Sequence, residues 1–185
     1  AKFRLDYYSN QPDESGNIPR EIMEIILTMC KNYAAKFDGK GTNLIFTGGP
    51  GLGKTFLSAC IARTVADRGY SVVYESAGHL FANLERAKFA NDEAAREASR
   101  RYSDCDLLII DDLGTEMPGQ FTTAALYALV NERLLAGKPM IISTNLNSDD
   151  LGKRYSPQIR SRLEGNFKVI PFRGQDIRVM KNRGF

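Results

Sequence analysis

One stretch of eight residues combines a flexible backbone with a positive charge and a hydroxyl group. The stretch runs through Gly48, Gly49, Pro50, Gly51, Leu52, Gly53, Lys54 and Thr55. Its glycines let several backbone N–H groups turn inward, which creates a cradle for phosphate. Lys54 adds a point charge for the β- and γ-phosphates, and the Thr55 hydroxyl is a ligand for Mg²⁺. The full match to G-x-x-x-x-G-K-[ST] predicts an ATP/ADP site, in which we include the next residue, Phe56.

A pair of acids follows an unbroken apolar run farther along the chain. The run is Leu107 to Ile110, and Asp111 and Asp112 close it. Such a run is typical of a buried parallel strand, which would place both carboxylates at a sheet edge. We predict that Asp111 holds Mg²⁺ through its water shell and that Asp112 orients the attacking water. The alternative is an Asp pair that caps a turn.

Another polar residue closes the next apolar strand. Ser143 and Thr144 lead to Asn145, whose amide is expected between the P-loop strand and the Asp111 strand. There it would reach the γ-phosphate and the attacking water. A simple turn, in which the Asn145 side chain bonds its own backbone, is the alternative.

Strands and helices alternate along the chain. Short apolar strands are expected at 43–47, 71–75, 107–110, 139–143 and 167–172. Helices are expected at 55–68, 77–88, 92–102, 121–136, 149–155 and 157–163. The alternation predicts an α/β fold with a central parallel five-stranded sheet and helices on both faces.

An amphipathic helix precedes the first strand. Its apolar positions are Ile22, Ile25, Ile26, Met29, Tyr33 and Phe37. Asn17 is its expected N-cap, and Pro19 suits its first turn. We predict a single domain over 1–185, with a linker and first helix at 1–40 and the P-loop core at 41–185. The chain begins with Ala1, which leaves room for a preceding partner-binding domain.

The composition is that of an ordinary globular protein. The 185 residues carry a net charge of +3, which does not by itself indicate nucleic-acid binding. No apolar run approaches the roughly 18–20 residues that span a bilayer, so we expect a cytoplasmic protein. Cys30, Cys60 and Cys105 lie in apolar stretches and are expected to be buried free thiols. The lone His79 has no partners for a zinc or catalytic role.

Three segments together resemble the AAA+ domain of DnaC/DnaI-type replicative helicase loaders, and IstB-type transposition helpers are similar. The segments are Gly48–Thr55, Ile109–Glu116 and Ser143–Asn145, and the likeness covers roughly residues 3–178. It implies a P-loop NTPase fold of the AAA+ ASCE type. A C-terminal helical lid is not expected, because little of the chain follows the last predicted strand.

The resemblance also gives roles to arginines near the C-terminus. In this family an arginine just before a leucine reaches the ATP site of the neighbouring subunit, and here it corresponds to Arg162, with Arg160 as the alternative. A solvated basic helix face would explain both without any such role. Arg178 would sense the phosphates of its own subunit.

The function that the resemblance implies is ATP-dependent helicase loading in DNA replication. The protein would bind Mg²⁺–ATP and single-stranded DNA, assemble through its ATP sites, and deliver or open a replicative helicase. ATP hydrolysis to ADP and phosphate would depend on Lys54, Asp111, Asp112, Asn145 and Arg162. Many AAA+ proteins have Glu where this chain has Asp112, so we expect slow hydrolysis that DNA or a partner stimulates.

Single-stranded DNA would contact the helices predicted between residues 77 and 102. Lys88, Arg96, Arg100 and Arg101 are the candidate phosphate contacts there. The alternative is that these residues form an ordinary solvated helix face. Tyr7 and Tyr8 are candidates for the adenine pocket, although core or surface packing explains them better.

Three other functions remain compatible with the sequence. The first is a transposition helper of the IstB type that acts on duplex DNA. The second is a P-loop small-molecule kinase, although no arginine-bearing lid segment stands out. The third is a switch that binds ATP without hydrolysing it, which the aspartate at position 112 leaves open.

Overall fold

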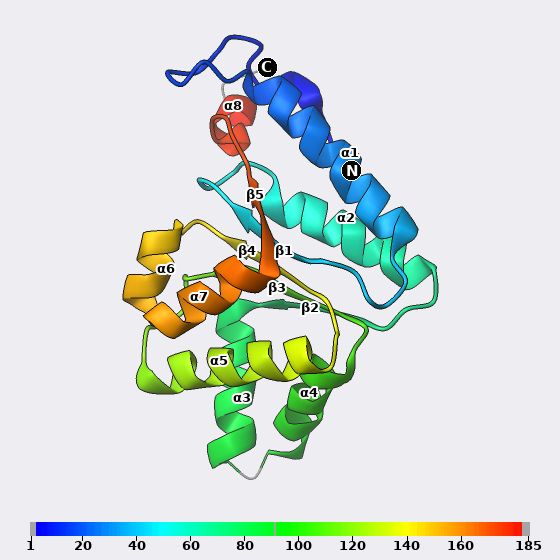
Figure 1. The fold of residues 1–185 in the computed structure, drawn as a ribbon, viewed down its shortest axis with the longest axis vertical. Coiled ribbons are helices and arrows are strands. Elements are labelled where there is room, and N and C mark those ends of the chain that lie inside the picture. Colours follow the sequence, from blue (N-terminus) through cyan, green and yellow to red (C-terminus); the bar gives the residue numbers. More distant parts are fainter. Residues whose placement is uncertain (1–2, 91, 183–185) are drawn as a thin grey trace.

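A parallel sheet of five strands forms the centre of the molecule (Figure 1). In this computed structural model, which describes residues 3–90 and 92–182, the strands are β1 (Asn43–Thr47), β2 (Val72–Ser76), β3 (Leu107–Leu113), β4 (Met140–Thr144) and β5 (Phe167–Pro171). Their order across the sheet is β2-β3-β4-β1-β5, and all neighbouring pairs are parallel. The predicted α/β fold is confirmed, and β4 lies between the P-loop strand β1 and the acidic strand β3.

The strands are apolar because both faces of the sheet are covered. In β3, Leu108 and Ile110 belong to one hydrophobic core, whereas Leu107 and Ile109 belong to the other. Successive side chains of a strand point to opposite faces, so a strand between two cores needs apolar residues at every position. This is the physical reason for the unbroken run ahead of Asp111.

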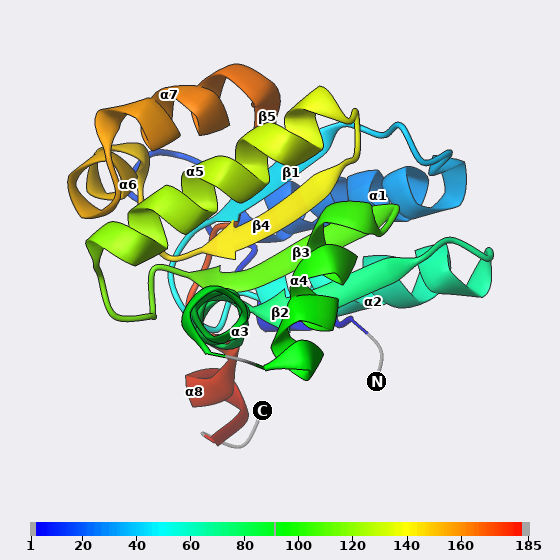
Figure 2. The same ribbon diagram turned by 90° about the horizontal axis from the view of Figure 1, so that it is seen from below.

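Helices pack on both faces of the sheet (Figure 2). One face carries α1 (Pro19–Lys36) and α2 (Lys54–Asp67). The other carries α3 (Ala77–Phe89), α4 (Glu93–Asp104), α5 (Gln120–Leu135), α6 (Ser148–Arg154) and α7 (Pro157–Asn166). The 3₁₀ turn η1 (Leu5–Tyr7) precedes α1, and after β5 the described chain forms only the short α8 (Ile177–Asn182).

Asn43 joins the P-loop strand to both of its neighbours. Its side-chain oxygen accepts a hydrogen bond from the Met140 N–H at 2.8 Å, at the start of β4. Its amide nitrogen donates to the Asn166 carbonyl at 3.2 Å, just before β5. One side chain thus sets where three parallel strands begin.

A buried arginine fastens the end of α4 to the start of β4. The Arg133 side chain on α5 is fully buried, and its guanidinium donates to backbone carbonyls only, apart from a contact with the Cys105 sulfur. The carbonyl acceptors belong to Tyr102, Ser103, Cys105 and Pro139. Carbonyls at a helix C-terminus lack partners within the helix, and Arg133 supplies donors to those of Tyr102 and Ser103 at the end of α4.

Three local predictions were wrong. Asn17 does not cap α1, because its backbone and side-chain N–H groups both bond the Asp13 carboxylate and Ile18 occupies the N-cap position. Ile25 lies on the outer side of α1 and is 67% exposed. Cys60 is exposed on α2, whereas Cys30 and Cys105 are buried as predicted.

No helix in the described part of the chain combines the length and the apolar character needed to cross a bilayer.

Candidate functional site

The glycine-rich loop joins β1 to α2 in a conformation that only glycine tolerates at two positions. Gly48 has φ 130°, and a Cβ there would lie 2.5 Å from the Phe172 carbonyl oxygen. Gly51 has φ 69°, and a Cβ there would lie 1.8 Å from the Asp176 carboxylate. The segments after β5 therefore pack directly against the loop, and the Ile177 N–H donates to the Gly51 carbonyl at 3.0 Å.

Lys54 is held between the loop and the end of β4. Its ammonium donates to the carbonyl oxygens of Gly48 (2.6 Å) and Gly49 (2.7 Å) and to the side-chain oxygen of Asn145 (2.7 Å). These three acceptors match the three donors of an ammonium group. Burial lowers the pKa of Lys54, and the nearby charges of Asp112 and Asp111 oppose that shift. The structure thus brings Lys54 and Asn145 together at the loop.

Three hydroxyl groups surround the Asp111 carboxylate at the end of β3. Thr55 donates to one oxygen at 3.2 Å, and Ser143 of β4 donates to the same oxygen. Tyr74 of β2 donates to the other oxygen at 2.7 Å. Ser143 and Tyr74 were not among the predicted site residues. Their role depends on the strand order β2-β3-β4, which places both beside Asp111 and which local sequence does not reveal.

Asp112 has an unusual backbone conformation. Its φ is 55°, and it is the only non-glycine residue with positive φ in the described ranges. The Ser143 hydroxyl accepts its N–H at 2.9 Å, which helps to fix this geometry. Asp tolerates the left-handed region better than most residues, but the conformation is still strained. Residues with such backbone strain cluster at functional sites. Burial, with the adjacent Asp111 charge, raises the pKa of Asp112.

The residues present fit Mg²⁺. Thr55 and Asp111 supply a hydroxyl and a carboxylate that already contact each other, and Mg²⁺ prefers such oxygen ligands with water and substrate phosphates completing its shell. No cluster of three or more His, Cys, Asp or Glu residues suited to a metal occurs within the described chain. A P-loop site needs none, because the nucleotide supplies the remaining ligands.

A cavity of 630 Å³ lies in front of the loop. Its lining residues are Phe3, Arg4, Tyr7, Pro50, Gly51, Leu52, Gly53, Lys54, Thr55, Phe56, Ala59, Asp112, Asn145, Ile177 and Arg178. Phe3, Tyr7 and Phe56 supply aromatic surface to its lining, whereas Lys54 and Asp112 supply charge. Tyr8 is buried and donates to the Leu52 carbonyl at 2.8 Å, so its role is to support the loop. Arg178 enters the cavity and forms an ion pair with Asp176 at 2.8 Å.

Two arginines on α7 are candidates for reaching the ATP site of a neighbouring subunit (in trans), and their surroundings differ. Arg160 forms ion pairs with Asp149 at 2.9 Å and with Glu164 at 3.1 Å. Arg162 is exposed, and its guanidinium lies 5.8 Å from the Tyr127 ring centroid. Neither arginine lines the cavity in front of the phosphate loop of its own chain. Arg162 is therefore the one presented to solvent without a carboxylate partner among the described residues.

The basic residues of α4 are largely neutralised by acids of the same helix. Arg96 pairs with Glu93 at 3.3 Å, and Arg100 pairs with Glu97 at 3.3 Å. Lys88, at the end of α3, lies 5.3 Å from the Phe89 ring centroid and 5.6 Å from that of Phe121. Of the four predicted DNA contacts, Lys88 and Arg101 have no ion pair within the described chain.

Known proteins resemble this chain in sequence and in fold. The family model described as "IstB-like ATP binding protein" matches residues 29–160. The replicative helicase loader DnaC of Escherichia coli (strain K12) is 25% identical over 147 residues, which make up 79% of this chain and 60% of that protein. This chain thus spans less than two thirds of the length of that relative.

Two solved structures have the same fold. A DnaC helicase loader superposes with a TM-score of 0.73 at 20% identity, over 92% of this chain and 96% of that one. A DnaI structure also gives a TM-score of 0.73, at 19% identity, over 92% and 95% of the two chains. The segment that the family model matches contains the phosphate loop, the acid pair and Asn145, and the chain belongs to the family of IstB-like ATP binding proteins.

Proposed function

We propose that this protein is an ATPase of the helicase-loader type, which binds Mg²⁺–ATP between subunits and delivers or opens a replicative helicase. The observation that carries the ATPase proposal is the convergence of Lys54, Asp111 and Asn145 beside the loop, at the carboxyl edge of β1, β3 and β4. The helicase role is supported by the similarity to the replicative helicase loader DnaC.

In the proposed binding step, the loop and α2 hold the phosphates. The backbone N–H groups of the loop and the positive end of the α2 dipole favour an anion. All three donors of the Lys54 ammonium are engaged by oxygens of the loop and of Asn145, so a bound phosphate would replace at least one of these acceptors. Phe3 and Tyr7 of the same cavity offer apolar surface to the base.

In the proposed hydrolysis step, Asp112 accepts a hydrogen bond from the attacking water and orients it. Asn145 adds a second polar contact, and Lys54 stabilises the charge that develops on the transferred phosphoryl group. Bound Mg²⁺ would supply further charge neutralisation at the β- and γ-phosphates. Thr55 and Asp111 would hold the metal, with the Tyr74 and Ser143 hydroxyls orienting the Asp111 carboxylate.

We propose that Arg162 completes the site of the neighbouring subunit. Its exposure on α7 and its position outside its own cavity support a role in trans. Single-stranded DNA is proposed to contact the end of α3, where Lys88 lies beside two phenylalanine rings. The pairing of Arg96 and Arg100 with glutamates argues against a large contribution from α4.

The test is the ATPase rate against added single-stranded and duplex DNA, with Lys54→Ala as the control. Stimulation by single strands that Lys54→Ala abolishes would support the loader proposal. Stimulation by duplex alone would favour the second candidate, a transposition helper, which the IstB-like family match supports. Tight ATP binding with no phosphate release under either condition would contradict an ATPase and favour a nucleotide switch.

A further inference from the structure

Glu116 is a buried carboxylate just beyond the catalytic strand. It follows the end of β3 by three positions, and only 5% of its side chain is exposed. A buried carboxylate is costly unless charged or hydrogen-bonding partners surround it. Its partners therefore show what the residue holds in place.

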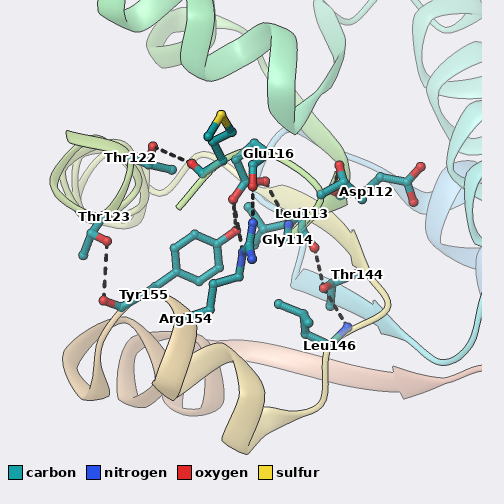
Figure 3. Close-up of polar contacts among 12 residues, drawn as sticks. Asp112, Leu113, Gly114, Glu116, Thr122, Thr123, Thr144, Leu146, Arg154 and Tyr155 are labelled. Atoms are coloured by element: carbon teal, nitrogen blue, oxygen red, sulfur yellow. Dashed lines mark hydrogen bonds and ion pairs between the residues drawn. The ribbon is translucent and has the colours of Figure 1, made fainter. Parts of the chain in front are cut away.

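The Glu116 carboxylate joins two distant segments (Figure 3). On the near side it accepts the Gly114 N–H at 2.9 Å. On the far side it accepts the Tyr155 hydroxyl and forms an ion pair with Arg154 at 3.6 Å. Arg154 also donates to the Glu116 carbonyl. Arg154 is the last residue of α6 and Tyr155 follows it directly, so the contacts tie the β3 loop to the α6–α7 junction.

The near side of this bridge leads to the hydrolytic residues. Gly114 has φ 104°, and a Cβ there would lie 2.6 Å from the Leu146 side chain. The Thr144 hydroxyl donates to the Leu113 carbonyl at 2.6 Å and accepts the Leu146 N–H at 3.1 Å. These contacts hold the segment between Asp112 and Glu116 against Thr144 and Leu146, the two neighbours of Asn145 in the chain.

On the other side, the contacts of Glu116 reach the start of α7, the helix that carries Arg162. Tyr155 is 7% exposed, and its carbonyl accepts the Thr123 hydroxyl of α5 at 3.4 Å. The next residue, Ser156, caps α7 by accepting the Ile159 N–H at 3.2 Å. Tyr155 therefore fixes the start of the helix that carries Arg162. Glu116 is therefore linked to the start of α7 through Tyr155 and Ser156.

We propose that Glu116 is a positioning residue that sets Asp112 of its own site and Arg162 of the neighbouring site in one geometry. Through it, the hydrolytic loop and α7 move as a unit, so each subunit aligns its own water-orienting acid and its neighbour's arginine together. This inference rests on the proposed function, because it needs ATP hydrolysis and an arginine that acts in trans.

The test uses mixtures of whole-chain variants in an ATPase assay. Lys54→Ala supplies Arg162 but cannot hydrolyse, and Arg162→Ala has an intact loop but supplies no arginine. Mixing the two should restore hydrolysis, because one kind of subunit completes the other. Failure of this mixture would overturn the proposed trans function itself.

The inference is then tested by adding Glu116→Gln to one partner of the mixture at a time. We expect kcat to fall about tenfold or more with the change on either partner, because small misplacements cost this much, while ATP affinity stays within about twofold. A normal rate with Glu116→Gln on the arginine donor would overturn the coupling while leaving the proposed function intact.

Two further variants separate positioning from folding. Tyr155→Phe removes only the hydroxyl that Glu116 accepts, and it should reproduce the kcat loss on both partners with the thermal midpoint nearly unchanged. Glu132→Gln alters an exposed glutamate of α5 that accepts only the Ser103 hydroxyl, and it should leave kcat unchanged. If Tyr155→Phe behaves like Glu132→Gln, the proposed positioning contact is wrong.

Discussion

At the scale of single residues, the site is built from groups whose environments set their tasks. Lys54 and Asn145 hold each other at the loop, and three hydroxyls orient Asp111. Asp112 combines a strained backbone with a carboxyl whose charged form is disfavoured by burial. Asp112 and the Asp111 partner Tyr74 can each be tested on these grounds.

Asp112→Asn should abolish hydrolysis while keeping the fold and ATP binding, because Asn also tolerates the left-handed backbone.

In the unmodified protein, the raised pKa of Asp112 means that its water-orienting carboxylate is lost at a higher pH than for an ordinary aspartate. The acid limb of kcat/KM against pH should therefore lie above 3.8, the usual value for Asp. Full activity down to that pH would contradict the role given to Asp112.

Tyr74→Phe should weaken the response to Mg²⁺. The change removes the hydroxyl that bonds Asp111 at 2.7 Å and leaves a ring of similar size. Loss of such a supporting hydrogen bond typically costs about 10- to 100-fold in metal affinity. A Mg²⁺ titration of ATPase rate should show a higher midpoint with the maximal rate largely kept. Tyr70→Phe, on the loop before β2, is the matched control and should not shift the midpoint.

At the scale of elements, sequence patterns predicted most of what the structure shows. The strands β3 and β4 can be predicted from their apolar runs, because a strand buried between two cores carries apolar side chains on both faces. One failure came from competition between neighbours: Asp13 binds Asn17, so Asn17 cannot serve α1 as a cap. The Tyr74 contact could not be predicted, because it depends on which strands are neighbours and local sequence does not encode that order.

Arg133→Met should lower the free energy of unfolding by about 3 kcal/mol or more, because several buried carbonyls would lose their donor. The junction of α4 and β4 depends on this guanidinium. Urea denaturation would measure the loss. Arg63→Met, on an exposed position of α2, is the control and should change the free energy of unfolding by less than about 0.5 kcal/mol. Equal effects of the two changes would show that the buried contacts contribute little.

At the scale of the whole molecule, the proposed function gives the arginines of α7 a role between one subunit and the next. Arg162→Ala should reduce kcat on the order of 10³-fold, with a small effect on stability, because its role lies in the assembled site. Arg160→Ala breaks two exposed ion pairs of α6 and α7 and should change kcat little. Comparison of the two rates at equal protein concentration assigns the trans residue, and a larger loss for Arg160→Ala would reverse the assignment.

The position of β1 between β4 and β5 also determines when the molecule can fold. The two backbone partners of Asn43 lie 97 and 123 positions later in the chain. During synthesis, the phosphate loop therefore leaves the ribosome long before either strand that flanks it exists. Both edges of β1 stay unpaired while the intervening residues are made, which is the kind of exposure that chaperones protect. A chain interrupted before β5 would keep the whole loop sequence and still lack a finished nucleotide site.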